Sequence, residues 1–377
     1  MYNNPEHLLI FAAGNDGNVS GTCTISSPAV GKNVLAVGAS SSGETRLTTT
    51  TESGEARVSL DQDPSDIDGV AFFSSNGPTA DNRIKPEIVA PGDQVLSVSG
   101  AGEAGHSCVL ELQFGTSMAT PVVAGAAAMI RQYFKDSNFY VADLEARGLC
   151  DGNSTSSAFV CAEFDPSAAT VKAVLINSAN TMGGSSEPNG LRGFGRVHLE
   201  AGLPLAGVSN IGLFVADSNT TSIAQDSVDI YTFETRENNA GEFRATLTWI
   251  DPPASTISSV QLVHDLDLVV TSPTGTAYMM WSSGESDSSN VIERVIVSTA
   301  DFESERNGTW TVSVSANVLI SETQPYSLVV TGPFGDGISV AASSSASTVV
   351  WRHGGIGGKL LVWAVAIATV FAGMLPM

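Results

Sequence analysis

Basic residues are scarce in this 377-residue chain: 17 lysines and arginines stand against 39 aspartates and glutamates, a formal charge of −22. A surface of that sign repels phosphate backbones and anionic lipid headgroups, which excludes DNA, RNA and headgroup binding. Charged residues of both signs make up only 15% of the sequence, and apolar residues make up 42%. That balance excludes a disordered chain and indicates a folded protein with a large core.

The N-terminus has neither the basic start nor the long apolar segment of a secretory signal peptide. The C-terminus differs, because the stretch from Leu360 to Met377 carries no charged residue. As a helix it would be about 27 Å long, close to the thickness of a bilayer core. It predicts attachment to a membrane, through either a spanning helix or a glycosylphosphatidylinositol signal. We therefore expect an extracellular or cell-surface protein that is anchored at its C-terminus.

Cysteines are few, and their spacing bears on the same question. Cys150 and Cys161 enclose a short loop and predict a local disulfide, and Cys23 and Cys108 would form a second pair. Four free thiols remain the alternative, because spacing alone does not fix pairing. Four N-x-[S/T] sequons predict glycosylation at Asn18, Asn153, Asn219 and Asn307. A sequon inside the Cys150–Cys161 loop favours an oxidising, secreted setting.

Residues 1–206 have the pattern of an α/β domain. Short apolar runs bounded by Gly, Pro and Asn predict strands buried on both faces of a parallel sheet, at 8–13, 33–39, 69–75 and 94–100. One helix is predicted from Ser117 to about Phe134. A second follows Asp165, the expected cap, and Pro166, and ends near Ala179.

Residues 207–335 change character. Alternation with a period of two predicts six strands of an antiparallel β-sandwich, at 229–235, 242–250, 266–272, 294–299, 309–315 and 326–332. Residues 336–359 are predicted to be a Ser/Gly-rich linker, and residues 360–377 are the apolar tail.

The segment "FGTSMATPVVAG", Phe114 to Gly125, places a serine at the start of an alanine-rich helix. A hydroxyl is a poor nucleophile unless it is activated and the developing oxyanion is received. A helix N-terminus aims free N–H groups and the positive end of the dipole at such a hydroxyl. Gly115 allows close approach of a bound peptide. Ser117 is therefore a candidate nucleophile, with an ordinary helix cap as the alternative.

These residues resemble a known family. "GTSMATPVVAG" is similar to the nucleophile motif of subtilisin-like serine proteases, and "FAAGNDG" (11–17) is similar to the segment that carries their oxyanion-hole asparagine. The resemblance implies that Asn15 donates its amide to the oxyanion and that Ser117 attacks the scissile carbonyl, with no cofactor in the chemistry. It also implies that Ala13 and Gly14 line the substrate pocket beside Gly115 and Thr116, and that the domain is a three-layer subtilisin-like fold.

The second domain resembles the C-terminal β-sandwich of one branch of that family, the KP-43-like oxidatively stable alkaline proteases. Members of this branch bind calcium, and the resemblance implies structural Ca²⁺ held by Asp265, Asp267 and Asn290. A polar strand edge is the alternative explanation of these residues.

This chain also departs from the family's sequence pattern. The family's aspartate and histidine motifs precede the asparagine segment, and only fourteen residues precede Asn15. The histidines present are His7, His106, His198, His264 and His353, and no spacing brings one to Ser117. We expect a truncated parallel sheet and a chain that is inactive alone, because loss of the nucleophile or of the base lowers turnover about a millionfold in a subtilisin.

Two functions follow as hypotheses. The first is a serine endopeptidase that acts on protein or peptide substrates through an acyl-enzyme at Ser117. The second is a catalytically dead, subtilase-like surface protein that binds a partner. A lipase-type hydrolase is excluded, because its nucleophile needs a G-x-S-x-G context and this serine lies in Gly115-Thr116-Ser117-Met118-Ala119.

Overall fold

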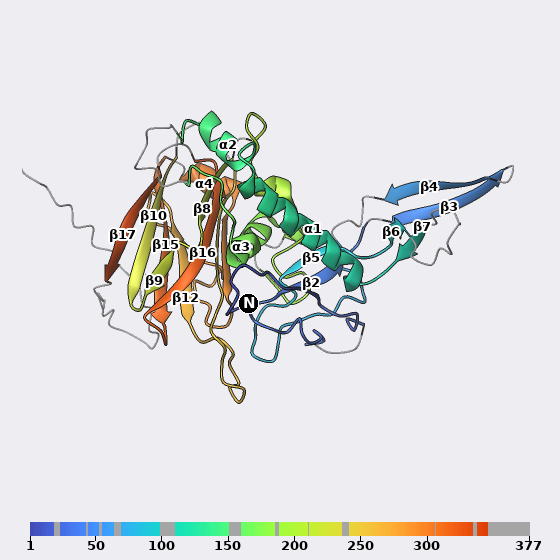
Figure 1. The fold of residues 1–377 in the computed structure, drawn as a ribbon, viewed down its shortest axis with the longest axis horizontal. Coiled ribbons are helices and arrows are strands. Elements are labelled where there is room, and N and C mark those ends of the chain that lie inside the picture. The colour runs from blue at the N-terminus through green and yellow to red at the C-terminus, as the bar shows by residue number, and fades with distance from the viewer. Residues whose placement is uncertain are drawn as a thin grey trace, which may run out of the picture.

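The computed structural model describes residues 1–18, 23–42, 44–52, 55–63, 69–98, 110–150, 160–184, 188–209, 211–235, 241–305, 307–334 and 338–345. Within them the chain forms a parallel-sheet unit, up to about residue 209, followed by a two-sheet unit, residues 211–345. Figure 1 shows the two units side by side, with helix α3 between them and two hairpins at the far end of the parallel-sheet unit.

The parallel-sheet unit is built on a three-stranded parallel sheet in the order β1-β2-β5. Its strands are β1 (Ile10–Ala12), β2 (Leu35–Ser40) and β5 (Ile88–Pro91). Two antiparallel hairpins extend from it, β3 (Glu44–Glu52) with β4 (Glu55–Asp63) and β6 (Val95–Val98) with β7 (Leu110–Gln113). Its helices are α1 (Thr116–Lys135), α2 (Tyr140–Ala146), α3 (Ala168–Ser178), and the short 3₁₀ turns η2 (Met182–Gly184) and η3 (Leu199–Ala201).

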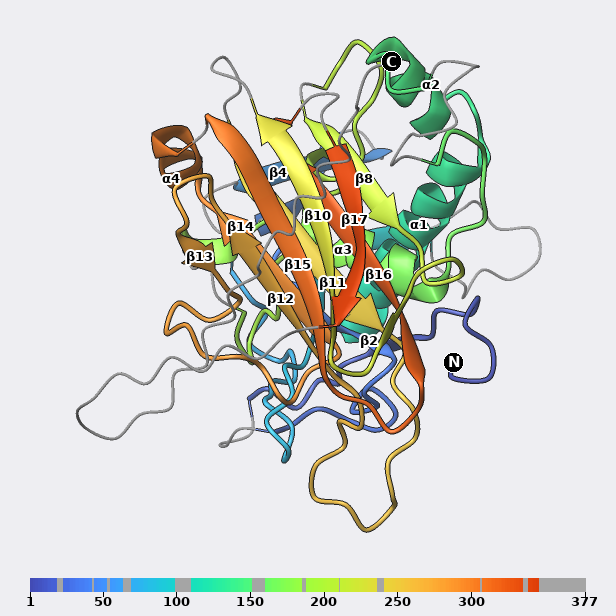
Figure 2. The same ribbon diagram turned by 90° about the vertical axis from the view of Figure 1, so that its left-hand side faces the viewer.

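The two-sheet unit contains two antiparallel sheets, whose strands run roughly alongside one another in Figure 2. One sheet has the strand order β13-β12-β15-β10-β17. In that order, the strands span Ala277–Tyr278, Asp265–Thr271, Gly308–Val318, Ser227–Thr235 and Ile338–Ser345. The other has the order β14-β11-β16-β8, Ile292–Val297, Phe243–Trp249, Thr323–Gly332 and Gly212–Ala216, with β9 (Ser222–Ala224) paired to β16. Helix α4 spans Thr299–Ser304. Stacked rings of Phe243, Phe302 and Trp310 join the two sheets in a common core.

Helix α3 joins the two units. All of its residues are buried, because α1 covers one side and strands β11 and β16 cover the other. On β11, Phe243, Ala245, Leu247 and Trp249 face the core, as the alternation predicts. Thr246 and Thr248 on the opposite face are buried as well, and their hydroxyls donate to Asn177 Oδ1 and the Ala169 carbonyl of α3. Polar side chains occupy this buried face because their hydroxyls form hydrogen bonds with helix α3 rather than with water.

Several predictions of secondary structure need correction. Residues 69–75 form only one bridge, Val70 to Ser40, and residues 95–98 pair with β7 outside the parallel sheet. The N-cap of helix α3 is Ser167, whose Oγ accepts a hydrogen bond from the Thr170 N–H at 3.1 Å. The predicted cap, Asp165, does not cap this helix. The predicted linker begins with strand β17. On α1, Ala126 and Ala127 are buried, but Ala124, Gly125 and Ala128 are exposed, so the alanine-rich stretch is only partly covered.

None of the helices that the structure describes is long and apolar enough to cross a membrane. The segment predicted as an anchor, residues 360–377, lies outside the described residues.

Candidate active site

Ser117 lies in the first turn of α1 and is exposed to solvent, directly after the buried Thr116. Gly115 precedes the helix with φ +144°, a backbone angle that side chains rarely allow. Its N–H donates to the Gly92 carbonyl at 2.8 Å, which fixes the turn to the end of β5. The hydroxyl of Ser117 is thus held at the carboxyl edge of the parallel sheet, where ligands bind in open α/β sheets.

Asn15 lies beside this turn although it is 102 residues from Ser117 in sequence. Its Oδ1 accepts hydrogen bonds from the Thr116 N–H at 2.9 Å and from the Thr116 hydroxyl at 3.0 Å. The Thr116 hydroxyl in turn accepts from the Gly14 N–H at 3.2 Å. A Cβ added at Gly115 would lie 3.3 Å from Asn15 Nδ2, so that nitrogen faces the turn before the nucleophile. Since Oδ1 accepts from both donors of Thr116, the Nδ2 hydrogens are the donors that Asn15 offers at this turn.

Ser75 forms hydrogen bonds with the residues on both sides of Asn15. Its N–H donates to the Gly14 carbonyl at 2.9 Å, and its Oγ accepts from the Asp16 N–H at 3.0 Å. Gly14 has φ +112°, and a Cβ there would lie 2.5 Å from Ser26 Oγ and 2.8 Å from Ser75 Oγ. Sequence analysis missed Ser75 and Ser26, since no spacing links them to Asn15. Only the contact between the loops reveals their part.

Ala13 differs from its predicted role. It is fully buried in a small cluster with Ile25, Ala29 and Ala36. Its N–H donates to the Val37 carbonyl, and its carbonyl accepts from the Ser26 N–H. These contacts and the burial of its side chain argue against the predicted role of Ala13. Gly115 and Thr116 are buried as well, whereas Gly14 is half-buried beside Asn15.

No described histidine is bonded to Ser117. His198 lies 3.8 Å from Glu200, and the ring of His264 is buried in the two-sheet unit beside Gln324. His7 is exposed near the N-terminus, and His106 and His353 lie outside the described residues. The described part of the chain therefore brings the predicted nucleophile and the predicted oxyanion donor into one turn region, and none of its histidines is hydrogen-bonded to Ser117.

The sequence profile of the subtilase family matches residues 2–195, just over half of the chain and the part that holds both Asn15 and Ser117. The chain belongs to the subtilase family. This membership supports serine-protease chemistry at the site built from the Asn15 loop and the start of α1.

Individual relatives agree with this assignment. The chain is 29% identical over 218 residues to the serine protease/ABC transporter B family protein tagA of Dictyostelium discoideum, which covers 53% of this chain and 11% of the relative. It is 38% identical over 137 residues to the serine protease AprX of Bacillus subtilis, 34% of this chain and 27% of that protein. It is 41% identical over 71 residues to pyrolysin of Pyrococcus furiosus, a match that covers 19% of this chain and 5% of pyrolysin. The chain therefore spans roughly a tenth of the length of the Dictyostelium relative.

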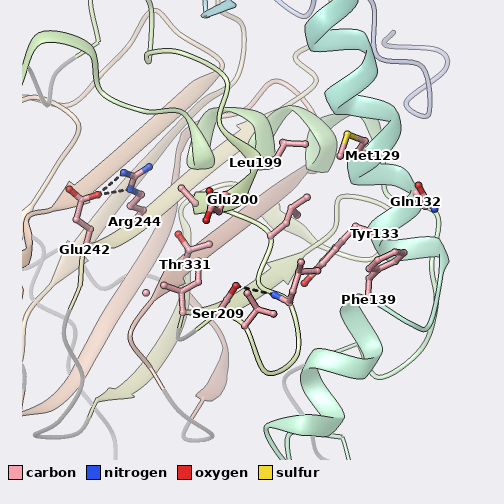
Figure 3. Close-up of a pocket in the computed structure, with 16 residues that line it drawn as sticks. Met129, Gln132, Tyr133, Phe139, Leu199, Glu200, Ser209, Glu242, Arg244 and Thr331 are labelled. Atoms are coloured by element: carbon pink, nitrogen blue, oxygen red, sulfur yellow. Dashed lines mark hydrogen bonds and ion pairs between the residues drawn. The ribbon is translucent and has the colours of Figure 1, made fainter. Parts of the chain in front are cut away.

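One cavity in the described part of this subtilase lies away from Ser117. It measures about 700 Å³ and opens between the second half of α1, residues 199–211 and the two-sheet unit (Figure 3). Its lining is mostly apolar, and the Arg244 guanidinium on its wall is already bonded to Glu242 and to two α3 carbonyls. Neither Ser117 nor Asn15 lines it, so this cavity is separate from the candidate active site.

Buried carboxylates gather at β12. Asp265 and Asp267 are neighbours on one face of that strand, and the Oδ1 atom of each is buried without a hydrogen-bond partner. Burial, followed by the Asp267 charge, raises the pKa of Asp265 to about 7. Burial likewise raises the pKa of Glu293, whose Oε1 is also unpartnered. Within the described ranges, no three His, Cys, Asp or Glu side chains are placed to hold one metal ion.

Asn290, the third predicted calcium ligand, has another role. Its Oδ1 accepts from the Ile84 N–H at 2.7 Å, and its Nδ2 donates to Asp287. It therefore links the two-sheet unit to the parallel-sheet unit, and this use of its carboxamide argues against metal ligation.

Cys150 and Cys161 form a disulfide, with the sulfurs 1.99 Å apart. Cys23 is exposed and forms no disulfide with any described residue, and its predicted partner Cys108 lies outside the described residues. Of the four sequon asparagines, Asn18, Asn219 and Asn307 are exposed, and Asn153 lies outside the described residues.

Proposed function

We propose that this chain carries the nucleophile and oxyanion hole of a serine endopeptidase. The supporting observation is the pair of hydrogen bonds from Thr116 to Asn15 Oδ1, 2.9 and 3.0 Å, which turn the carboxamide N–H groups toward the start of α1. An amide donor fixed beside a nucleophilic hydroxyl is the arrangement that acyl transfer requires.

In this mechanism the Ser117 oxygen attacks the carbonyl carbon of a peptide bond while a general base takes the hydroxyl proton. The carbonyl oxygen becomes an oxyanion. It receives hydrogen bonds from Asn15 Nδ2 and from the Ser117 N–H, which lies in a first helical turn that offers no intrahelical acceptor. As the intermediate collapses, the protonated base gives its proton to the departing nitrogen, the carbon–nitrogen bond breaks and the amine is released. An acyl-enzyme remains for water to hydrolyse.

The general base and its orienting carboxylate belong, in this proposal, to polypeptide other than the described residues. The described histidines are bonded elsewhere or remote in the fold, as His198 and His264 illustrate. The residues described here would then be inactive without that polypeptide.

The test uses the full-length product of the gene that encodes this chain. Quenched-fluorescent peptides and casein serve as substrates, and Ser117→Ala is compared with Ser137→Ala, a change at an exposed serine elsewhere. We expect Ser117→Ala to lower kcat/KM by at least 10⁴-fold and Ser137→Ala to leave it unchanged. Full activity in Ser117→Ala contradicts the proposal. Folded, unaltered protein without any hydrolysis supports the second candidate, a non-catalytic binding protein.

Calcium in the two-sheet unit is a further part of the proposal. The unpartnered Oδ1 atoms of Asp265 and Asp267 suit a hard cation that takes carboxylate, carbonyl and water oxygens. Two carboxylates from one strand, completed by main-chain and water oxygens, would hold it without Asn290.

The metal is tested by thermal unfolding of the chain in 1 mM CaCl₂ and in EDTA. We expect a rise in Tm with calcium, which Asp267→Asn abolishes and Asp301→Asn, at an exposed helix residue, preserves. Equal Tm values in calcium and EDTA for the unaltered chain contradict this part of the proposal.

An extracellular or cell-surface location is proposed as well, with the Cys150–Cys161 disulfide as its support. Membrane attachment through residues 360–377 and glycosylation at the exposed sequons belong to the same proposal. Mass spectrometry of protein purified from the native source tests it. A reduced Cys150–Cys161 pair together with unmodified Asn219 and Asn307 would contradict it.

A further inference from the structure

We infer that the apolar end of the two-sheet unit, formed by loop 252–263 and turn 317–322, lies against the surface of a lipid bilayer with zwitterionic headgroups. The inference rests on the membrane attachment proposed above, and it assigns the face that the attached protein turns toward the lipid. It does not involve the chemistry at Ser117.

Strand pairing brings the loop and the turn to the same end of the unit. The loop joins β11 to β12, and the turn joins the end of β15 to β16. Trp249 at the end of β11 pairs with Tyr326 near the start of β16, and Asp265 at the start of β12 pairs with Val318 at the end of β15. The loop projects beyond the strands in both views (Figures 1 and 2). Both connections therefore lie at one end of the two-sheet unit.

Apolar side chains at this end are open to solvent. Ile257 of the loop is 94% exposed and Ile320 of the turn is 73% exposed, while Val260 and Val318 are half-exposed. The loop has no charged residue, although the whole chain carries a formal charge of −22. Such a surface suits the boundary between headgroups and acyl chains, where apolar side chains leave water.

The charges at the border of the apolar end select the lipid. The turn ends with Glu322, an exposed carboxylate, and the exposed Asp226 lies beside it in the fold, since its N–H donates to the Ala316 carbonyl of β15. Neither the loop nor the turn contains a lysine or an arginine. Anionic headgroups would be repelled at this border, so the contact is apolar and the headgroups are zwitterionic.

The loop is held in place at both of its stems. Lys32 Nζ of the parallel-sheet unit donates to the Asp251 carboxylate and to the Pro252 carbonyl, both at 2.5 Å, and to the Gln261 carbonyl at 2.6 Å. Because the stems are fixed before any contact is made, little conformational entropy is lost when Ile257 enters the lipid interface.

The course of the chain places the proposed membrane attachment at the same end. Strand β17 ends at Ser345, which pairs with Ser227 at the start of β10, and β10 starts where β15 ends. Residues 346–359 separate this strand from the uncharged stretch 360–377. A segment of that length spans at most about 50 Å when fully extended. Attachment through 360–377 therefore keeps the apolar end near the bilayer at a high effective concentration.

The experiment uses the 377-residue chain with Cys23→Ser and Cys108→Ser, so that a thiol-reactive label attaches only to an introduced cysteine. The environment-sensitive fluorophore NBD is attached at Ile257→Cys or at Ile320→Cys, and vesicles of phosphatidylcholine are added. We expect the emission to rise about twofold or more, to shift to the blue and to be quenched by nitroxide-labelled lipid, because the label leaves water.

The matched control is the same label at Val208→Cys. Val208 is 76% exposed, and it precedes β8, whose Gly212 pairs with Gly332 at the opposite end of the two-sheet unit. We expect the emission of this label to be the same with and without vesicles.

Loss of the two isoleucines tests the contact by affinity. We expect the chain with both Ile257→Ser and Ile320→Ser to bind phosphatidylcholine vesicles about tenfold or more weakly than the unaltered chain, because two apolar side chains no longer leave water. Val208→Ser should bind as the unaltered chain does. Both isoleucines are exposed, so the substitutions should preserve folding, which circular dichroism and Tm check.

Three results overturn the inference: unchanged emission at both isoleucine positions on vesicle-bound protein, an equal response at Val208, or sedimentation showing that the apolar end is buried between two copies of the chain. Flotation with the vesicles separates this inference from the attachment on which it rests. If the chain floats while the labels at Ile257 and Ile320 do not respond, the inference fails and the attachment stands. If the chain does not bind the vesicles, both fail. Labelling of Ser117 by a fluorophosphonate in the full-length protein tests the protease chemistry separately.

Discussion

At the scale of single residues, the site depends on how one carboxamide is oriented. Asn15 could present either its oxygen or its nitrogen toward the nucleophile. The two donors of Thr116 occupy Oδ1 and favour presentation of the nitrogen, as the proposed oxyanion role requires. In the proposed mechanism Thr116 is therefore a positioning residue, and Asn15 itself contacts the reacting oxygen.

Removal of the amide donor should lower turnover. In the full-length protein, Asn15→Ala is expected to reduce kcat about 100- to 1000-fold with little change in KM, the range known for loss of such a donor from a subtilisin. Steady-state kinetics on one peptide substrate measures both parameters. A kcat within twofold of the unaltered enzyme would show that Asn15 does not receive the oxyanion.

The positioning role of Thr116 predicts a smaller effect. Thr116→Val removes the hydroxyl but keeps the N–H bond to Asn15 Oδ1, so we expect kcat to fall about tenfold, the value of one hydrogen bond, with KM unchanged. Thr116→Ser restores the hydroxyl and should restore kcat. If the Ser and Val variants are equally impaired, packing of the methyl group explains the defect and the positioning role is wrong.

Sequence alone could predict that the segments of Ser117 and Asn15 belong to one candidate site, because both are contiguous motifs, and the structure brings these segments into contact. It could not predict Ser75 or Ser26, whose roles exist only where separate loops meet, nor the burial of Ala13, which depends on Ile25 and Ala36 packing over it. The bond between the Ile84 N–H and Asn290 Oδ1 could not be predicted for the same reason, because it spans 206 residues.

At the scale of elements, the two units share one helix. The C-terminal carbonyls of α3 receive guanidinium groups from the two-sheet unit: Arg294 donates to Ile176 O at 3.0 Å, and Arg244 donates to Asn177 O at 3.0 Å. Cations at a helix C-terminus also interact favourably with its dipole. Helix α3 is therefore completed by strands that follow it in sequence, and we expect the units to fold together.

This coupling predicts the effect of Arg294→Met. The substitution removes the guanidinium donor of the buried Ile176 carbonyl, which keeps only the Ala179 N–H at 3.3 Å, and we expect the free energy of unfolding to fall by about 1–3 kcal/mol. Urea unfolding measures the change. Lys135→Met, which breaks a pair with Asp165 whose side chains are each 54% exposed, should cost less than 1 kcal/mol. Equal losses in the two variants would mean that the arginine does not complete the helix.

Element boundaries followed the sequence where apolar periodicity was strong, as in β10, β11 and α1. The hairpins β3–β4 and β6–β7 escaped prediction because hairpin pairing depends on strand register rather than on burial in the main sheet. Strand β17 escaped because its Ser/Ala-rich sequence resembles a linker, and only pairing with β10 makes it a strand.

At the scale of the whole molecule, buried ions connect the parallel sheet, α3 and the two-sheet unit. Lys85 and Lys172 share the carboxylate of Glu87, at 2.5 and 3.3 Å, and Lys32 reaches Asp251 at 2.5 Å. Two buried ammonium groups on one carboxylate leave a surplus positive charge. Burial lowers the pKa of Lys85 from 10.5 to about 8, although Glu87 opposes the shift.

The lowered pKa predicts how stability changes with pH. The folded chain releases the Lys85 proton near pH 8, while the unfolded chain keeps it to about 10.5. The free energy of unfolding should therefore rise by about 1–2 kcal/mol between pH 8 and 9.5, and this gain should disappear as the pH falls through 8. Urea titrations at several pH values measure it. Lys85→Met should flatten the profile, and an unchanged profile in that variant would assign the effect to another group.

The central claim is that the Ser117 hydroxyl is an activated nucleophile and that Asn15 donates a hydrogen bond to the oxyanion that forms. Its most direct test is mass-spectrometric mapping after treatment of the full-length protein with a fluorophosphonate probe. The account predicts one adduct on Ser117, slowed at least tenfold by Asn15→Ala, and absent from Ser117→Ala. An adduct on a different serine, or none on folded protein, would contradict it.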